Sequence, residues 1–483
     1  MSTLGIGSTI PRSAGLTPDE PLMDPNDVRT AFTVAMSAMY RDEVPLYGDL
    51  VRIVRTVNEE VLSQRSLTGN TSLTTGTSIP HRLDLERHGA IRLGTPHELR
   101  TVSRIFAIIG LKAVGYYDLS VAGLPMHATC FRPIDLASLN KNPFRVFTTL
   151  LRPELLVDEE ARSLAIKLLA RRNIFSDRLL ELIDLAESQN NRLTALQAEE
   201  FIAEAMKTFS WRPEASASEE EYRKLATEHP ILADIASFKS SHINHLTPRT
   251  LDIVASQERM KVEGLKVKDR IEGPPQRRCP ILLRQTSFLA LEERIKFRDS
   301  RGPLIEGTHR ARFGEIEERG AAVTPAGRKL YDDLLEKAMV KFRVLPGNPG
   351  PEVMDRISEE VFKEYPDSWE ELRKQELIYC TYHRTGKPSL EDVSEHLSLE
   401  DLVCQGYLTA KPITYEDFLP FSAAGIFQSN LGSSKKRIID SKKPDQEGYE
   451  RALGYALLSA DDLYLKSQKE SIENCALGCI LGA

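Results

Sequence analysis

The chain has 483 residues, of which 41% are hydrophobic and 28% are charged, and its formal net charge is −7. This composition is typical of a globular enzyme, and the acidic balance argues against a nucleic-acid-binding protein, which would show a basic surface. No run of 18 apolar residues is available to span a membrane. Six scattered cysteines without a Cys-x-x-Cys pair, and no secretory signal, predict a cytoplasmic location.

The N-terminal part begins with a polar segment and continues with helices. Residues 1–26 are rich in Ser, Thr, Pro and Gly and are expected to be disordered. Asp27 is predicted to cap a first helix, because apolar residues follow it at helical spacing. A second helix is expected over about 46–63, and a polar loop over 66–78.

The segment 86–94 reads Glu-Arg-His-Gly-Ala-Ile-Arg-Leu-Gly. His88 and Arg92 stand four residues apart, so they share one face of either a strand or a helix. A metal-ligating imidazole and a fixed cation on one face can hold an anionic substrate against a metal. Thr95-Pro96 with a Glu at 98 then predicts a helix start, and a strand is expected over 113–119.

The rest of the chain mixes short strands with long helices, which predicts the α+β class. We expect one catalytic domain over 27–465, followed by a C-terminal tail over 466–483. Helical patterns occur over 135–210, 325–340, 351–364, 389–405 and 450–470, and strand-like patterns over 236–245, 281–289, 311–318 and 375–381.

Three candidate metal ligands share a sequence context. His88, His245 and Glu315 each precede a Thr-Pro pair, and each is expected on a strand that runs into a helix start. Two imidazoles and one carboxylate can cover one face of an octahedral Fe(II) and leave three positions open. Two alternatives remain open at this point. His242 competes with His245 on the opposite face of the expected strand, and Glu317 shares a face with Glu315.

Four separated motifs make the chain resemble the 2-oxoadipate dioxygenase/decarboxylase family, over about residues 27 to 465. They are the segment 86–94, Asn-His-Leu-Thr-Pro-Arg at 244–249, Arg-Phe-Gly-Glu-Ile-Glu at 312–317, and Phe-Leu-Pro-Phe-Ser-Ala-Ala-Gly-Ile-Phe at 418–427.

The resemblance implies a fold and a set of site residues. The fold is a vicinal-oxygen-chelate core, in which βαβββ units curl into a barrel around a metal, with extensive helical additions. The metal is Fe(2+), held by His88, His245 and Glu315. Arg92 grips a substrate carboxylate, and Phe421 and Ser422 close the far end of the pocket.

The resemblance also implies a reaction. A 2-oxo dicarboxylic acid, 2-oxoadipate, and O₂ are converted to 2-hydroxyglutarate and CO₂, as in lysine catabolism. Two alternatives are a glyoxalase-like metal-dependent lyase or isomerase and a non-catalytic binding protein on the same fold. Neither nucleic acid nor a membrane is expected as a partner.

Overall fold

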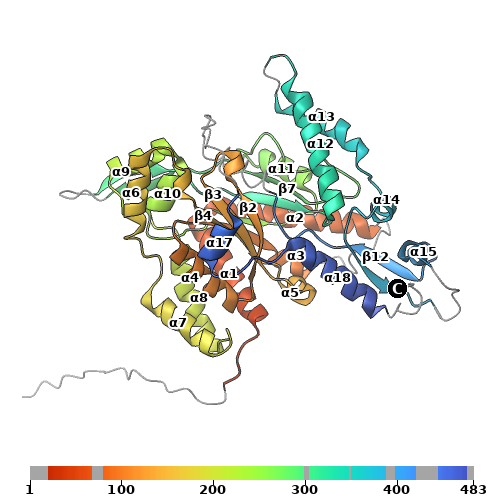
Figure 1. Ribbon diagram of the computed structural model, residues 1–483, viewed down its shortest axis with the longest axis horizontal. Coiled ribbons are helices and arrows are strands. Elements are labelled where there is room, and N and C mark those ends of the chain that lie inside the picture. The colour runs from red at the N-terminus through yellow and green to blue at the C-terminus, as the bar shows by residue number, and fades with distance from the viewer. Residues whose placement is uncertain are drawn as a thin grey trace, which may run out of the picture.

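The computed structural model describes residues 20–67, 80–297, 304–347, 350–387, 397–419 and 444–475. The expected pocket residues Phe421 and Ser422 therefore lie outside the described residues. Helices and short strands are mixed throughout the described ranges (Figure 1), which confirms the predicted α+β class.

A five-stranded sheet forms the centre of the molecule. It is built from β1 (Arg87–Leu93), β2 (Lys112–Asp118), β3 (Met126–Arg132), β4 (Arg145–Leu151) and β6 (His245–Pro248), in the order β2-β3-β4-β1-β6. β1 pairs in parallel with β4 and antiparallel with β6. With α4 (Pro96–Ile108) between β1 and β2, the first part of this sheet is a βαβββ unit. The described strands form open sheets, and they do not show the closed barrel that was expected.

The turn from β1 into α4 follows the predicted helix start. The Thr95 side chain accepts a hydrogen bond from the backbone N–H of Glu98 at 3.2 Å, and Pro96 occupies the first helical position. All seven residues of β1 are buried, including its histidine and both arginines. Because buried polar groups need partners, these side chains must point to other polar groups.

Helices cover one face of the sheet with a common hydrophobic core. α8 (Ala195–Phe209) packs against α1 (Pro25–Glu43) and α7 (Asp177–Ser188), α7 packs on α4, and α2 (Pro45–Leu67) packs on α1. α1 begins at Pro25 with Asp24 as its cap, so the prediction that Asp27 caps this helix is wrong. Pro25 accounts for the shift, because proline favours the first position of a helix.

A two-stranded sheet completes the centre. β7 (Leu283–Ser287) and β10 (Glu315–Arg319) pair antiparallel, with Glu315 opposite Ser287 and Glu317 opposite Gln285. β10 also lies beside β6, and the backbone N–H of Thr250 donates to the carbonyl of Glu317 at 2.7 Å. This contact brings β10 to the edge of the central sheet, next to β6 and β1.

Three sequence predictions are wrong in this region. The expected strand over 236–245 is mostly helix and loop, because Pro230 starts α10 (Pro230–Ser237) and the strand β6 begins only at His245. Thr247-Pro248 does not start a helix, since both residues lie in β6, where an edge position tolerates proline. The helical pattern over 135–210 is interrupted by β4, whose Val, Phe and Thr residues favour a strand.

The C-terminal pattern over 450–470 corresponds to two helices rather than one. α17 (Gln446–Leu453) ends at Gly454, which has a φ of 98°, and α18 (Ala460–Asn474) follows. A left-handed glycine at this position ends a helix. α18 packs against β11 (Cys380–Arg384), which pairs with β12 (Leu408–Pro412).

The other described elements surround this centre, with α6, α9 and α10 gathered at one side and α12 and α13 projecting together (Figure 1). The helices are α3 (His81–Leu85), α5 (Leu136–Lys141), α6 (Glu159–Leu169), α9 (Glu219–Glu228), α11 (Ile253–Val262), α12 (Pro325–Arg343), α13 (Pro351–Val361), α14 (Trp369–Lys374) and α15 (Leu399–Cys404). Short 3₁₀ turns span Ser120–Ala122, Pro153–Leu155 and Phe362–Glu364. A further sheet, of three strands, has the order β5 (Glu214–Ala215), β8 (Glu293–Phe297) and β9 (Ile305–His309).

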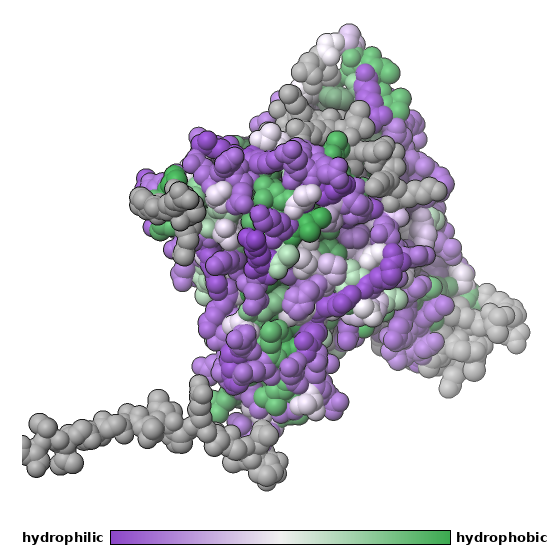
Figure 2. Space-filling model, turned by 60° about the vertical axis from the view of Figure 1, so that its left-hand side comes forward, coloured by the Kyte–Doolittle hydropathy of each residue, from purple (hydrophilic) through white to green (hydrophobic). Residues whose placement is uncertain are grey.

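One face of the molecule is mainly polar. Figure 2 shows hydrophilic residues over most of one face, with hydrophobic residues in small separate patches. Among the described helices, none combines the length and the apolar character that a membrane span requires.

Gly320 directly follows β10 and packs against the backbone of Pro280. We expect alanine at this position to destabilise the fold. A Cβ at Gly320 would lie 2.3 Å from the backbone carbonyl carbon of Pro280, which no side-chain rotation can relieve. Gly320→Ala should therefore lower the free energy of unfolding by about 1–3 kcal/mol, the usual cost of overpacking. Urea denaturation measures this loss. Gly386→Ala is the matched control, because a Cβ there meets nothing within 4 Å, and equal stability of the two variants would contradict the prediction.

Candidate metal centre

The structure brings the three predicted ligands together from three strands. His88 lies on β1, His245 begins β6 and Glu315 begins β10. Glu315 Oε1 lies 2.9 Å from His88 Nε2 and 3.8 Å from His245 Nε2. One potential ligand atom from each of the three residues falls within 4.8 Å of the other two. This compact arrangement is what a single metal ion requires.

Strand pairing explains why residues so distant in sequence meet. In the register of β1 and β6, His245 pairs with Ala90, which shares a face of β1 with His88. The two histidines are therefore diagonal neighbours on one face of the sheet, and their ring centroids lie 5.3 Å apart. The contact between β6 and β10 then places Glu315 beside both rings.

The protonation states of two members suit metal binding. Burial lowers the pKa of His245 to about 4, so its imidazole is neutral at pH 7. Burial by itself would raise the pKa of Glu315, but the neighbouring imidazoles of His245 and His88 lower it below its usual value. A neutral imidazole and an ionised carboxylate are the forms that bind metals.

The carboxylate of Glu315 is oriented by two hydrogen bonds to one of its oxygens. The Thr247 hydroxyl and the Gln285 amide donate to Oε1 at 3.0 and 2.8 Å. Within the described part of the chain, Oε2 of the same carboxylate is buried and has no hydrogen-bond partner. A buried anionic oxygen without a donor is costly unless a cation lies beside it. The donor set and this orphaned oxygen fit a divalent metal ion.

Glu317, the sequence alternative to Glu315, lies on the other side of the His88 ring. Its Oε2 is 2.9 Å from His88 Nδ1, whereas Glu315 is beside Nε2. Burial opposes the ionisation of Glu317, but the charges of Arg319 and His88 lower its pKa. Burial likewise lowers the pKa of His88, and the carboxylates of Glu317 and Glu315 raise it above its usual value. Glu317 is thus placed to orient His88 and increase its basicity, as carboxylates behind metal-bound histidines do.

His242, the sequence alternative to His245, belongs to a second buried group. Its Nε2 lies 3.2 Å from Asp234, which also contacts His309 at 2.8 Å. Neither Asp234 nor His309 was predicted as a site residue. Asp234 lies two residues before the strand expected over 236–245, in a stretch for which no element was predicted. His309 ends a strand, β9, that no strong sequence pattern marks.

Arg92 faces the candidate metal centre from β1. It is buried, and its Nη1 lies 2.6 Å from Asp234 Oδ2. Burial is the main cause of the low pKa of His245, and the nearby charge of Arg92 contributes to it. The structure therefore places His88 and Arg92 on one face of β1, as predicted.

Aromatic rings enclose the two histidines. The Phe418 ring lies edge-on to His88 with centroids 4.9 Å apart, and the Phe313 ring lies 4.8 Å from His245. Both phenylalanines are buried. They keep bulk water away from the histidine rings, which strengthens electrostatic interactions in the site.

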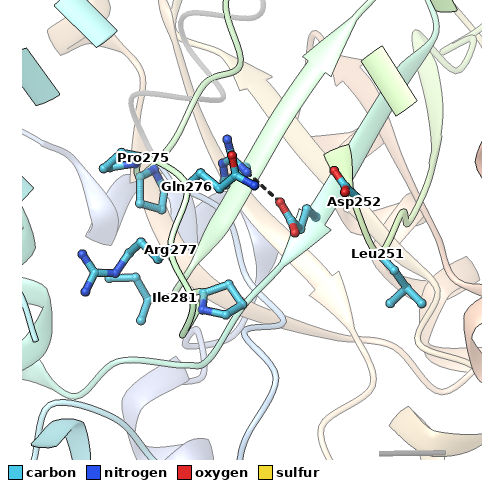
Figure 3. Close-up of a pocket in the computed structure, with 10 residues that line it drawn as sticks. Leu251, Asp252, Pro275, Gln276, Arg277 and Ile281 are labelled. Atoms are coloured by element: carbon cyan, nitrogen blue, oxygen red, sulfur yellow. Dashed lines mark hydrogen bonds and ion pairs between the residues drawn. The ribbon is translucent and has the colours of Figure 1, made fainter. Parts of the chain in front are cut away.

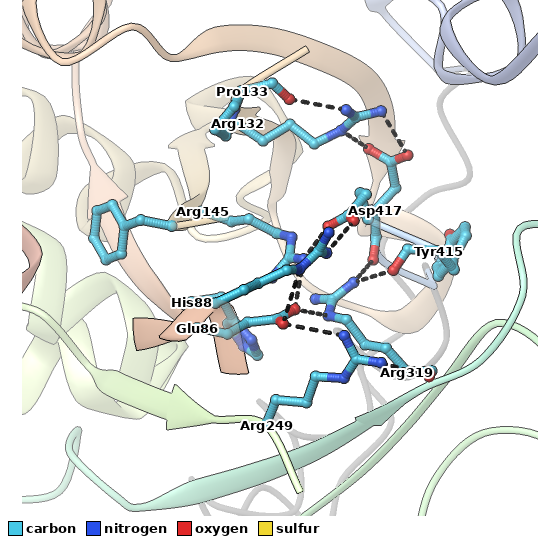
Figure 4. Close-up of polar contacts among 12 residues, drawn as sticks. Glu86, His88, Arg132, Pro133, Arg145, Arg249, Arg319, Tyr415 and Asp417 are labelled. Atoms are coloured by element: carbon cyan, nitrogen blue, oxygen red, sulfur yellow. Dashed lines mark hydrogen bonds and ion pairs between the residues drawn. The ribbon is translucent and has the colours of Figure 1, made fainter. Parts of the chain in front are cut away.

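A buried network of arginines and carboxylates fixes the segment that carries Phe418. Arg132 donates to both carboxylate oxygens of Asp417 at 2.7 and 3.0 Å, and Arg145 contacts Glu416 and Glu86. Figure 4 shows these contacts converging beside His88. Arg319 also donates to the backbone carbonyl of Asp417 at 3.0 Å. These bonds hold residues 416 and 417, directly before Phe418, against β3, β4 and β10.

A surface pocket of about 110 Å³ lies beside β10 (Figure 3). Its lining includes Asp252, Gln276, Arg277 and Glu318, and Glu318 pairs with Arg284 at 2.9 Å. Because alternate residues of a strand face opposite sides, Glu318 points away from Glu315 and Glu317. This pocket is therefore separate from the metal centre.

The chain matches known proteins over most of its length. A family model described as 2-oxoadipate dioxygenase/decarboxylase matches residues 32–430. Proteins named 2-oxoadipate dioxygenase/decarboxylase from Pseudomonas putida and Escherichia coli are each 45% identical to the chain. The first alignment covers 96% of this chain and 100% of the relative, and the second covers 94% and 98%.

A solved structure also matches the chain over nearly its whole length. The hydroxyglutarate synthase of Pseudomonas putida, in complex with 2-oxoadipate, superposes with a TM-score of 0.84 at 44% identity, covering 95% of this chain and 99% of that one. The chain therefore belongs to the 2-oxoadipate dioxygenase/decarboxylase family.

Proposed function

We propose that this protein is an Fe(II)-dependent dioxygenase and decarboxylase that converts 2-oxoadipate and O₂ to 2-hydroxyglutarate and CO₂. The observation that carries the proposal is the buried group of His88, His245 and Glu315, with Arg92 on the same face of the sheet. Relatives 45% identical over nearly the whole chain bear the name of this activity. The atoms balance without an external reductant, because both oxygen atoms of O₂ end in the two products.

His88, His245 and Glu315 are the proposed iron ligands. When bound there, Fe(II) supplies Lewis acidity and three open positions for the 2-oxo acid and O₂. Thr247 and Gln285 hold the Glu315 carboxylate in place, and Glu317 holds the His88 ring. Three ligands on neighbouring strands form a rigid site, which fixes the direction of the open positions.

Arg92 is the proposed partner of a substrate carboxylate. Its planar guanidinium suits a carboxylate, and it stays charged when buried. It projects from the same face of β1 as His88, so it can hold the substrate while the 2-oxo group reaches the metal. Phe418 and Phe313 exclude water from the reacting end. Phe421 and Ser422 are proposed to close the other end of the pocket.

We also propose that the core is a vicinal-oxygen-chelate fold. The unit β1-α4-β2-β3-β4 has the βαβββ order of that fold. β6 and β10 supply the second histidine and the glutamate. Because the site takes side chains from β1 through Phe418, we propose that residues 27–465 form one catalytic domain.

The activity is tested by loading the metal-free protein with Fe(II) under anaerobic conditions and then adding 2-oxoadipate and O₂. We expect one CO₂ and one 2-hydroxyglutarate for each O₂ consumed, and no turnover after iron removal by a chelator. Protein loaded with Zn(II) or Ni(II) is the control for a glyoxalase-like lyase or isomerase. The absence of O₂ consumption with every 2-oxo acid would contradict the oxygenase assignment. Faster turnover of 2-oxoglutarate would contradict the assignment of 2-oxoadipate as the substrate.

The proposed ligand and its orienting carboxylate should differ in their effects on iron affinity. His88→Ala removes a ligand and should abolish stoichiometric iron binding. Glu317→Gln keeps the ligand but loses the anion behind it, and should weaken iron binding about 10–100-fold. Competition with a coloured chelator measures both affinities. Glu318→Gln is the matched control, since its side chain lies on the opposite face of β10, and an equal loss in that variant would contradict the role of Glu317.

A further inference from the structure

A second buried group of polar side chains adjoins Arg92. It comprises Asp234 of α10, His242 and His309, which ends β9. Asp234 Oδ2 lies 2.6 Å from Arg92 Nη1, while Oδ1 lies 2.8 Å from His309 Nε2 and 3.2 Å from His242 Nε2. One carboxylate thus links the proposed substrate-binding arginine to two histidines.

The hydrogen bonds of His309 fix its tautomer. The Tyr222 hydroxyl lies 2.7 Å from Nδ1, and Asp234 lies beside Nε2. Burial would raise the pKa of Asp234, but Arg92 and the histidines hold it well below its usual value. The ionised carboxylate therefore accepts a hydrogen bond from the Nε2–H of His309. Nδ1 then accepts a hydrogen bond from Tyr222.

Aromatic packing fixes the orientation of both rings. Trp211 stacks on His309 with centroids 5.8 Å apart and an interplanar angle of 8°. The same indole lies edge-on to His242 at 4.6 Å, and Phe238 packs against both histidines. The carboxylate of Asp234 therefore lies between two imidazole rings that cannot easily rotate, and the ring of His309 is hydrogen-bonded to it.

A second metal site is the other use that these three residues suggest, because their ligand atoms lie close enough to hold an ion. Two contacts oppose it. The guanidinium of Arg92 lies against the carboxylate that would have to bind the metal, and two buried cations side by side repel each other. His309 also has both ring nitrogens engaged, by Tyr222 and by Asp234.

We propose that Asp234 is a positioning residue that acts through Arg92. Held by His242 and His309, it fixes the direction in which the Arg92 guanidinium meets the substrate carboxylate, so that substrate binding need not order this long side chain. It also offsets the charge of a buried arginine before substrate arrives. This inference rests on the proposed function, because it requires Arg92 to bind the substrate.

The test is a double-mutant cycle with Asp234→Asn, Arg92→Ala and the double variant. Anaerobic calorimetry of the Fe(II)-loaded proteins measures the affinity for 2-oxoadipate, and steady-state kinetics measure KM and kcat. We expect Asp234→Asn to weaken binding and raise KM at least tenfold, with kcat changed less than threefold and iron affinity unchanged. In the Arg92→Ala background, the same substitution should change affinity less than twofold.

A second variant keeps the test decisive if Asp234→Asn fails to fold. His309→Phe retains an aromatic ring against Trp211 but removes the donor to Asp234, and should weaken binding about three- to tenfold only when Arg92 is present. Glu400→Gln is the matched control, because it breaks a partly buried carboxylate–arginine pair with Arg373, between α14 and α15. It should leave 2-oxoadipate affinity unchanged.

The outcomes separate the inference from the proposed function. If Arg92→Ala leaves the affinity unchanged, the assignment of Arg92 to the substrate fails. If Arg92→Ala weakens binding but Asp234→Asn does not, or tightens it, only the positioning role of Asp234 fails. An effect of Asp234→Asn that persists without Arg92 would show a general structural role. A second iron per chain that Asp234→Asn removes would show a metal site instead.

Discussion

The carboxylate of Glu315 lies fully buried between two histidine rings, and much of the surrounding structure compensates that charge. An isolated carboxylate in a protein interior is strongly unfavourable, because no water solvates it. Here the Thr247 hydroxyl, the Gln285 amide and the two imidazoles surround it. These partners come from β6, β7 and β1, so the same charge that is proposed to bind the metal also ties three strands together.

The compensation extends outward in pairs of opposite charge. Behind His88, Glu317 is neutralised by Arg319, and Glu86 by Arg145 and Arg249. Pairs of this kind gain little stability over apolar packing, but losing one partner leaves an unpaired buried charge. These buried charge pairs occur at positions that orient site residues, and the apolar cores lie on either side of them. The charged layer is therefore better explained by the geometry of the site than by stability.

Local sequence signals predicted the parts of this site that local chemistry determines. The Thr95-Pro96 cap and the strand before it follow from residue preferences, and they place His88 and Arg92 on one face. The meeting of His88 with His245 and Glu315 depended on a family resemblance, because strand pairing over such distances leaves no local pattern.

The choice between Glu315 and Glu317 as the candidate ligand also needed tertiary structure, because no local pattern distinguishes the two. Glu315 and Glu317 share a face of β10, and only the position of the His88 ring between them separates their roles. No helix was predicted at residues 230–237, so no local pattern indicated that Asp234 lies on α10 and reaches Arg92. Pro248 was misinterpreted because a Thr-Pro pair starts a helix at two other places, whereas here the residues continue an edge strand.

β1 sets the distance between the two ends of the proposed substrate site. His88 and Arg92 are four residues apart on one strand, which separates their Cα atoms by about 13 Å at roughly 3.3 Å per residue. Both edges of β1 are paired, with β4 on one side and β6 on the other, so this separation cannot change without breaking two ladders. Asp234 fixes the arginine and Glu317 fixes the histidine, which leaves neither end free to adjust. The proposed site would select its substrate by length, because a 2-oxo acid would have to span from the metal to the guanidinium. Any change in preferred chain length must therefore come from side chains other than these two.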